Sequence, residues 1–505
     1  MTLTTSAQYP PQNIYVEPFP GNLANLFPQP PGLVEASHTW PPIQLIYISF
    51  YLSKLGCKTV VTESHYIDRD FIHEHSAFYS RSLRGYPNYC QRMHFFKASF
   101  TEQEWRVYVT DVDRRPQTIE FLQKAYLGFL VVRPLPGSPV GRTILVPYEK
   151  ITETGLARSF GAVRSHSVQL GGLDLTVIGA AFQQQDQGVS ACATIALWSS
   201  IHNTAHNENL YVPTPAEITQ AASKYVLSSG RSFPSEGLNL AQMCEGVRDA
   251  GLEPLVVHSV SVEADRFQLL SYINSGFAPV LGIRSIDGGD GHAVCAVGLK
   301  LGEIAAQENP EFHYQDAGST VRAVYIHDDR LGPYASAEIG AWTIKEKIAT
   351  GLLIRWPDKD IMNEQSILLW MLVPMPAKAR MPVSRMRALG LNLAQAIGQL
   401  FPEFSKRITF RCSYCFASKY RRSATQIGLS AAGLYGLNCE IPLSRYIGLI
   451  ELSVPEGPLL DVLLDATETR ANPSVLAFVV RQKFSSKHVP QLGLVAKNTD
   501  ARMFI

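Results

Sequence analysis

The residue whose type and position most clearly indicate catalytic chemistry is Cys192, which lies at the start of an apolar run of helical length at residues 191–201. A cysteine at the start of a buried helix faces backbone N–H groups and the positive end of the helix dipole, which favour the thiolate. A polar segment at residues 183–188 lies just ahead, and a glutamine amide there can donate to a developing oxyanion. Because free cysteine is among the most buried residue types, Cys192 taken alone also fits an inert core thiol.

A candidate base for that thiol is His292. It follows the glycine-rich segment at residues 288–291 and precedes small apolar residues at 293–298 that are typical of a strand entering the core. A catalytic base needs an exposed ring on a rigid support, and this placement provides both. The alternative is a histidine that only satisfies its hydrogen bonds at a strand end.

Two carboxylates follow a third segment, the strand-like residues 321–326. Asp328 or Asp329 could accept a hydrogen bond from the second ring nitrogen of His292, which would fix the tautomer and stabilise the imidazolium. We expect Asp328 to take this position. Asp329 and Arg330 fit an ordinary turn with solvated charges.

The order Cys192, His292 and Asp328 resembles the papain-like cysteine peptidases. The glutamine-rich residues before the cysteine and the His-Ala-Val-x-x-Val-Gly strand belong to the same likeness, which covers residues 175–334. It is closest to the branch that processes bacteriocin leader peptides, which the helix, glycine and Pro-Val strand of residues 270–283 also resemble. The resemblance implies a helix carrying the cysteine, packed on an antiparallel sheet that carries the histidine and the aspartate.

In the resembled family a glutamine before the cysteine donates to the oxyanion. The usual spacing of six residues falls on Asp186, with Gln185 and Gln187 on either side. We expect Gln185 to be the donor, because it follows the strand-like residues 177–182, and Gln187 is the alternate.

The resulting chemistry is acyl transfer to a thiol. The Cys192 thiolate would attack a carbonyl carbon, and the His292 imidazolium would protonate the leaving amine before water resolves the acyl-enzyme. The expected enzyme is a peptidase or isopeptidase with a protein or peptide substrate, and it needs no metal or organic cofactor. Two alternatives stay open: an acyltransferase or transglutaminase-like enzyme with the same triad, and a catalytically inactive papain-like binding module.

The chain that must position these residues is too long for one hydrophobic core. A single core stops growing near about 300 residues, and this chain has 505. We expect an α+β fold with a Pro-rich arm at residues 1–40 and α+β regions at 41–150 and 359–505, flanking the papain-like core at 151–358. Thr214, Pro215 and Glu217 form a capping box. Apolar patterns predict helices at 43–55, 239–250 and 384–400, and strands at 127–132, 143–146, 279–283, 292–297, 367–373, 447–454 and 475–480.

Composition limits the binding partners and the cellular compartment that we expect for this protein. The formal net charge is +1, so the chain has no electrostatic footprint for nucleic acid or an anionic membrane. The longest apolar run, residues 367–373, is too short to span a bilayer, and no lysine or arginine precedes Lys54. Eight scattered cysteines do not resemble a disulfide framework, so a reducing cytoplasm is the expected location. Nothing in the sequence indicates an oligomeric state.

Two further clusters contain metal-ligand residue types. Cys412 and Cys415 have the spacing of half a zinc site, with Cys439 and His488 as the available further ligands, but two core thiols on a strand explain them better. The histidines and acids of residues 65–75 fit a helix with polar faces more simply than a metal site.

Overall fold

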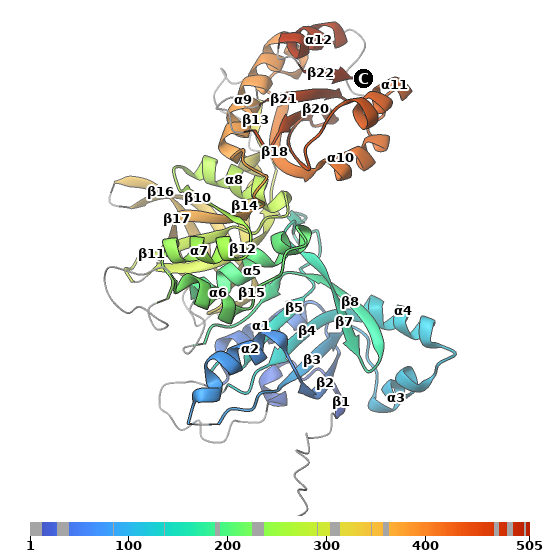
Figure 1. The fold of residues 1–505 in the computed structure, drawn as a ribbon, viewed down its shortest axis with the longest axis vertical. Coiled ribbons are helices and arrows are strands. Elements are labelled where there is room, and N and C mark those ends of the chain that lie inside the picture. The colour runs from blue at the N-terminus through green and yellow to red at the C-terminus, as the bar shows by residue number, and fades with distance from the viewer. Residues whose placement is uncertain are drawn as a thin grey trace, which may run out of the picture.

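The protein has a mixed α+β fold built from three large sheets and a separate hairpin. Figure 1 shows the N-terminal region at the bottom, the central region in the middle and the C-terminal region at the top. Among the described helices none is long and apolar enough to cross a membrane. The computed structural model describes residues 13–27, 40–83, 85–135, 137–186, 192–224, 237–289, 291–303, 314–344, 346–356, 363–468, 474–481, 488–498 and 501–505.

The N-terminal region is a six-stranded antiparallel sheet in the order β1-β2-β3-β4-β5-β9. The described part of the Pro-rich segment forms its edge strand, so these residues pack on the body. The apolar pattern at residues 43–55 predicted α1 correctly. The elements are β1 (Ile14–Pro18), α1 (Ile43–Lys54), β2 (Thr59–Tyr66), α2 (Arg69–Ala77), β3 (Cys90–Phe96), α3 (Glu102–Thr110), α4 (Arg115–Ala125), β4 (Tyr126–Val132), β5 (Val140–Leu145) and β9 (Ala181–Phe182).

The central region is an antiparallel sheet closed on itself. Its order is β10-β17-β11-β12-β14-β15-β16, and an additional pairing of β17 with β16 completes the ring. The Thr214 capping box opens α6 as predicted. The elements are β6 (Ala157–Ser159), the hairpin of β7 (Arg164–Leu170) and β8 (Leu173–Gly179), α5 (Cys192–Asn207), α6 (Pro215–Ala222), α7 (Leu240–Asp249), β10 (Glu253–His258), α8 (Val262–Asn274), β11 (Val280–Ser285), β12 (Gly291–Leu301), β14 (Val321–Asp328), β15 (Gly332–Ile344), β16 (Lys347–Ile354) and β17 (Glu364–Met375).

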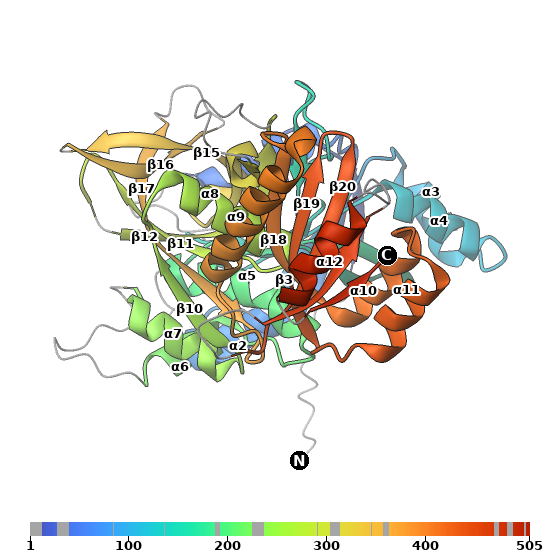
Figure 2. The same cartoon turned by 90° about the horizontal axis from the view of Figure 1, so that it is seen from above.

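The C-terminal region is a six-stranded sheet with helices on both faces (Figure 2). One apolar cluster joins the sheet to α9 and α12, and a second joins the opposite face to α10 and α11. The predicted helix at residues 384–400 is α9. The elements are β13 (Tyr314–Asp316), α9 (Val383–Leu400), β18 (Ile408–Phe416), α10 (Ala417–Ser423), α11 (Ala431–Tyr435), β19 (Tyr446–Val454), β20 (Gly457–Asp465), β21 (Val475–Val480), α12 (Val489–Asn498) and β22 (Arg502–Phe504).

The sheets do not follow the boundary that we placed between residues 358 and 359. Strand β17 lies beyond it, yet pairs with β10, β11 and β16 in the central sheet. Conversely, β13 lies before it and pairs in parallel with β18 of the C-terminal sheet. The chain therefore crosses between the two regions more than once, which an apolar pattern along the sequence does not reveal.

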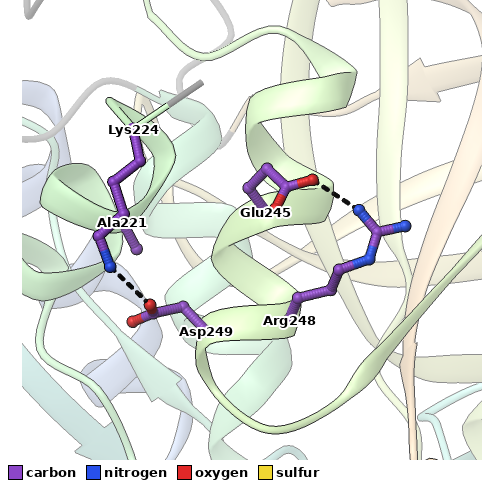
Figure 3. Close-up of a pocket in the computed structure, with 5 residues that line it drawn as sticks. All are labelled: Ala221, Lys224, Glu245, Arg248 and Asp249. Atoms are coloured by element: carbon purple, nitrogen blue, oxygen red, sulfur yellow. Dashed lines mark hydrogen bonds and ion pairs between the residues drawn. The ribbon is translucent and has the colours of Figure 1, made fainter. Parts of the chain in front are cut away.

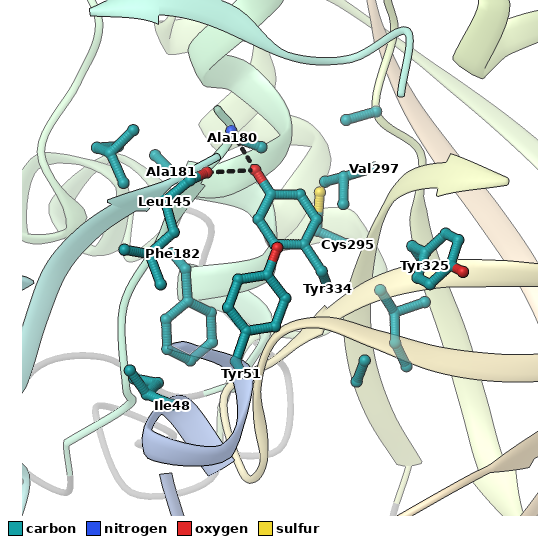
Figure 4. Packing of buried hydrophobic residues seen from close by; sticks show 14 of the residues in the cluster. Ile48, Tyr51, Leu145, Ala180, Ala181, Phe182, Cys295, Val297, Tyr325 and Tyr334 are labelled. Atoms are coloured by element: carbon teal, nitrogen blue, oxygen red, sulfur yellow. Dashed lines mark hydrogen bonds between the residues drawn. The ribbon is translucent and has the colours of Figure 1, made fainter. Parts of the chain in front are cut away.

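The N-terminal and central regions share one hydrophobic core. Figure 4 shows the junction, where Tyr334 of β15 lies against Tyr51 of α1 with ring centroids 5.7 Å apart. The Tyr334 hydroxyl accepts from the backbone N–H of Ala180 at 2.8 Å and donates to the carbonyl of Leu145 at 3.1 Å. The N-terminal region is therefore built onto the central sheet and shares its core.

Candidate active site

Cys192 is the first residue of α5. Its side chain is half-buried, whereas the next thirteen residues of the helix are all buried. The helix packs against β12, which carries the candidate histidine. The thiol thus sits at a helix N-terminus, where the dipole favours negative charge.

His292 stands near the beginning of β12, where it pairs with Ile283 of β11. Its ring is 11% exposed, and its Nε2 lies 3.0 Å from Oδ1 of Asp328. The thiol of Cys192 interacts with the same ring and contributes to raising its pKa. Because Nε2 faces the carboxylate, Nδ1 is the nitrogen left for the thiol. The structure thus brings together the cysteine, histidine and aspartate that the sequence singled out.

Asp328, the last residue of β14, is fully buried and held on both oxygens. Arg330 donates its backbone N–H at 3.0 Å and its Nε at 3.1 Å to Oδ1, and its Nη2 at 2.8 Å to Oδ2. We expected Arg330 to belong to a solvated turn with Asp329, and this was wrong. The guanidinium of Arg330 bonds the side chain of Asp328, two residues earlier in the chain, and so fixes the carboxylate that faces His292.

Asp329 is the second carboxyl group at the site. Its Oδ1 lies 3.6 Å from Nε2 of His292, and within the described residues neither of its oxygens has a hydrogen-bond partner. Its backbone carbonyl accepts from the side-chain amide of Gln44 on α1 at 2.8 Å. No local sequence pattern indicates this role for Gln44, because the contact joins residues far apart in the chain.

The charges of these groups shift one another's pKa values. Burial by itself lowers the pKa of His292, but the charge and hydrogen bond of Asp328 outweigh it and raise that pKa to about 10. Burial raises the pKa of Asp328, yet His292 and Arg330 hold it well below its usual range. Burial, with the neighbouring charge of Asp328, raises the pKa of Asp329 to about 7. The arrangement therefore favours an imidazolium beside the thiol over a wide pH range.

A metal ion is the other species that these side chains could hold. Within the described ranges, only His292, Asp328 and Asp329 bring three potential ligand atoms together, all within 4.8 Å of one another. Arg330 already bonds both oxygens of Asp328 and supplies the positive charge that a cation would bring. The donor set therefore fits an imidazolium–carboxylate pair better than a metal centre.

In the polar segment before Cys192, Gln183 and Gln184 are held by hydrogen bonds to the N-terminal region. Gln183 donates its side-chain amide to the buried Glu74 of α2 at 2.8 Å. The side-chain oxygen of Gln184 accepts from the backbone N–H of Val140 at 3.2 Å, and the backbone N–H of Gln184 donates to the Val140 carbonyl at 3.0 Å. These two glutamines are occupied and cannot turn toward a substrate.

Gln185 differs from its neighbours. It is half-buried, and among the described residues no hydrogen bond of its amide is found. Asp186, which occupies the usual register of the oxyanion glutamine, is buried and lies 3.4 Å from the guanidinium of Arg133. The alternate, Gln187, lies outside the described residues. Gln185 is thus the amide in this segment that is left for a ligand.

The other candidate ligand clusters do not assemble a site. Cys412 and Cys415 both lie on β18, and side chains three apart on a strand point to opposite faces. His488 instead contacts Glu403 at 2.7 Å. The acids of residues 65–75 cap α2 or pair with arginines, as in the 2.7 Å contact of Asp68 with Arg142.

A surface pocket lies between α6 and α7, and its lining residues are distant in the sequence from Cys192, His292 and Asp328 (Figure 3). The charged side chains that line it are exposed and pair with each other: Lys224 with Asp249 at 2.9 Å, and Arg248 with Glu245 at 2.6 Å. It contains none of the candidate triad residues.

Comparison with known proteins adds no assignment. The chain matches no protein-family model and no curated protein sequence at a significant level. The functional interpretation therefore depends on the geometry of the site and on the residue patterns.

Proposed function

We propose that this protein is a cysteine hydrolase that cleaves a peptide or isopeptide bond. The observation that carries the proposal is that the ring of His292 hydrogen-bonds the buried carboxylate of Asp328 and also interacts with the thiol of Cys192, which raises the pKa of the ring. A thiol at a helix N-terminus beside an imidazolium is a suitable nucleophile.

The reaction follows from these positions. The Cys192 thiolate forms a bond to the carbonyl carbon, and the carbonyl oxygen becomes an oxyanion that the amide of Gln185 can bind. The tetrahedral intermediate collapses to a thioester, and the imidazolium of His292 gives its proton to the leaving amine. Water then attacks the thioester, neutral His292 takes a proton from it, and the carboxylic acid and the free thiol are released.

A papain-like core is the fold that we propose for this site. Support comes from the arrangement of α5, which begins at Cys192 and packs on β12, while β12 and β14 are antiparallel neighbours that carry His292 and Asp328. A helix bearing the thiol on an antiparallel sheet bearing the base and its partner is the layout that the sequence resemblance implies.

Two small reagents test the proposal without knowledge of the substrate. Iodoacetamide alkylates an activated thiolate, and p-nitrophenyl acetate acylates it with release of p-nitrophenolate. We expect Cys192 to react faster than Cys439, which is exposed and lies outside the site. Cys439 is a better reference than Cys57, because burial raises the pKa of Cys57 to about 12. Peptide mapping identifies the modified residue.

Variants distinguish the outcomes. Cys192→Ala should abolish the fast phase of both reactions, whereas Cys439→Ser should leave that fast phase unchanged. If Cys192 reacts no faster than Cys439, the thiol is not activated and an inactive binding module explains the site instead. If the acyl group passes to an added amine in preference to water, the enzyme is an acyltransferase.

A further inference from the structure

A buried arginine of the N-terminal region holds the segment that leads to Cys192. Arg133 follows β4 and is 2% exposed. Its Nη2 donates to the backbone carbonyl of Gln184 at 3.0 Å, and its Nη1 lies 3.4 Å from Asp186 and 3.2 Å from Glu74. One guanidinium therefore contacts the residue before Gln185, the residue after it and a helix of the N-terminal region.

The arginine is itself fixed in place. Its Nε donates to the carbonyl of Ser138 at 3.1 Å, and its backbone N–H bonds the carbonyl of Pro139 at 2.8 Å. The neighbouring strand leaves room for the side chain at Gly141, where an added Cβ would lie 2.9 Å from Cγ of Arg133. A planar guanidinium with several fixed donors restricts its partners more strongly than a lysine ammonium would.

The charges make this contact hard to replace. Asp186 and Glu74 are both buried, and Arg133 is the cation that contacts each of them in the described residues. Without the guanidinium both buried carboxyl groups would lose this cation, and folded proteins answer the loss of a buried ion-pair partner by rearrangement or protonation. Loss of Arg133 should therefore let the segment around Gln185 move.

We propose that Arg133 is a positioning residue for the oxyanion donor: it holds Gln184 and Asp186 so that the intervening Gln185 presents its amide beside Cys192. The proposal rests on the proposed cysteine hydrolase and adds that the N-terminal region takes part in the chemistry. Arg133 itself does not touch the reacting atoms. Its effect should be seen only in reactions that pass through an oxyanion.

Two reagents separate that effect from a general loss of structure. Acylation by p-nitrophenyl acetate proceeds through a tetrahedral oxyanion, whereas alkylation by iodoacetamide displaces iodide at a saturated carbon and forms none. We expect Arg133→Lys to slow acylation of Cys192 while its alkylation rate stays unchanged. Gln185→Ala should do the same, by up to the roughly 10²- to 10³-fold typical of losing one oxyanion donor. The double variant should lose little more than Gln185→Ala alone, since both changes remove the same interaction.

Arg142→Lys is the matched control. Arg142 is a neighbouring arginine that pairs with Asp68 at 2.7 Å and is not among the contacts of residues 183–186. Its replacement should leave the ratio of acylation to alkylation unchanged. If Arg133→Lys does not fold, Asp186→Asn removes one side of the contact with a neutral side chain of the same shape. It should lower the same ratio.

Each outcome decides the proposal. Equal loss of acylation and alkylation in the folded variants would give Arg133 a purely structural role and overturn it. An unchanged ratio in the folded variants, with an active wild-type protein, would overturn the role of Arg133 alone. If wild-type Cys192 reacts with neither reagent, the cysteine hydrolase itself is wrong and the role of Arg133 falls with it.

Discussion

Replacing Asp328 by asparagine should lower the pKa of His292 from about 10 to about 6–7, close to its ordinary value of about 6.5. The carboxylate oxygen lies 3.0 Å from Nε2, and the side chain is fully buried. At an effective dielectric constant of about 20, opposite charges about 3–4 Å apart attract by about 4–5 kcal/mol, or about 3–4 pKa units. Asparagine keeps the shape and removes this attraction, while the burial that lowers the pKa of the ring remains. At pH 8 the imidazolium fraction should fall from about 99% to about 1–10%.

The ring can be titrated directly by NMR in protein labelled at the histidine Cε1 carbon. The signal of His292 is assigned by its absence from His292→Gln. Asp329→Asn is the matched control, because Asp329 lies farther from Nε2, at 3.6 Å, and should lower the pKa of His292 by less. Arg330 keeps Glu364 as a partner at 3.0 Å in the Asp328 variant, so the turn should persist. If the ring of Asp328→Asn still titrates near pH 10, Asp328 does not stabilise the imidazolium and our account of the site is wrong.

Three further predictions concern stability. The folded protein raises the pKa of His292 to about 10. The stabilisation contributed by the His292 side chain should therefore be complete below about pH 6.5 and should be lost as pH rises toward about 10. Urea unfolding of wild-type protein and of His292→Gln at several pH values measures this contribution. Gly282→Ala should destabilise by about 1–3 kcal/mol, because an added Cβ would overlap the ring of Trp370, whereas Gly340→Ala, with ordinary contacts, should not. Thr214→Ala should cost about 1 kcal/mol through loss of the cap of α6, and Thr214→Ser should restore most of it.

Local patterns singled out the three residues that the structure brings together, because each of them has a local signature. An apolar run after a cysteine, glycines before a histidine and acids at a strand end all occur within a few residues of the side chain concerned. The pairing of Arg330 with Asp328 was missed, because it depends on how the turn after β14 folds back. The sequence already favoured Gln185 as the oxyanion donor, but it did not reveal that the side chains of Gln183 and Gln184 bond residues of the N-terminal region.

The same distinction applies to the fold. The apolar strand at residues 367–373 was predicted, but its place in the central sheet was not. Strand β17 pairs on one edge with β11 and on the other with β10 and β16, and these pairings join segments far apart in the chain. Apolar periodicity indicates which residues are buried in a strand, but it contains no information about which strand lies alongside. Closure of the central sheet is therefore a property of the tertiary structure alone.

The N-terminal region is part of the candidate site and not an accessory to it. Gln44 of α1 holds the backbone beside the acidic pair, and Arg133 holds the segment before Cys192, so both sides of the site are anchored outside residues 151–358. The shared core gives the same result, since Tyr334 of the central sheet buries its ring against α1 and bonds the carbonyl of Leu145. Removal of residues 1–150 would expose this apolar surface and release both anchors. The smallest unit able to perform the proposed chemistry therefore includes the N-terminal sheet.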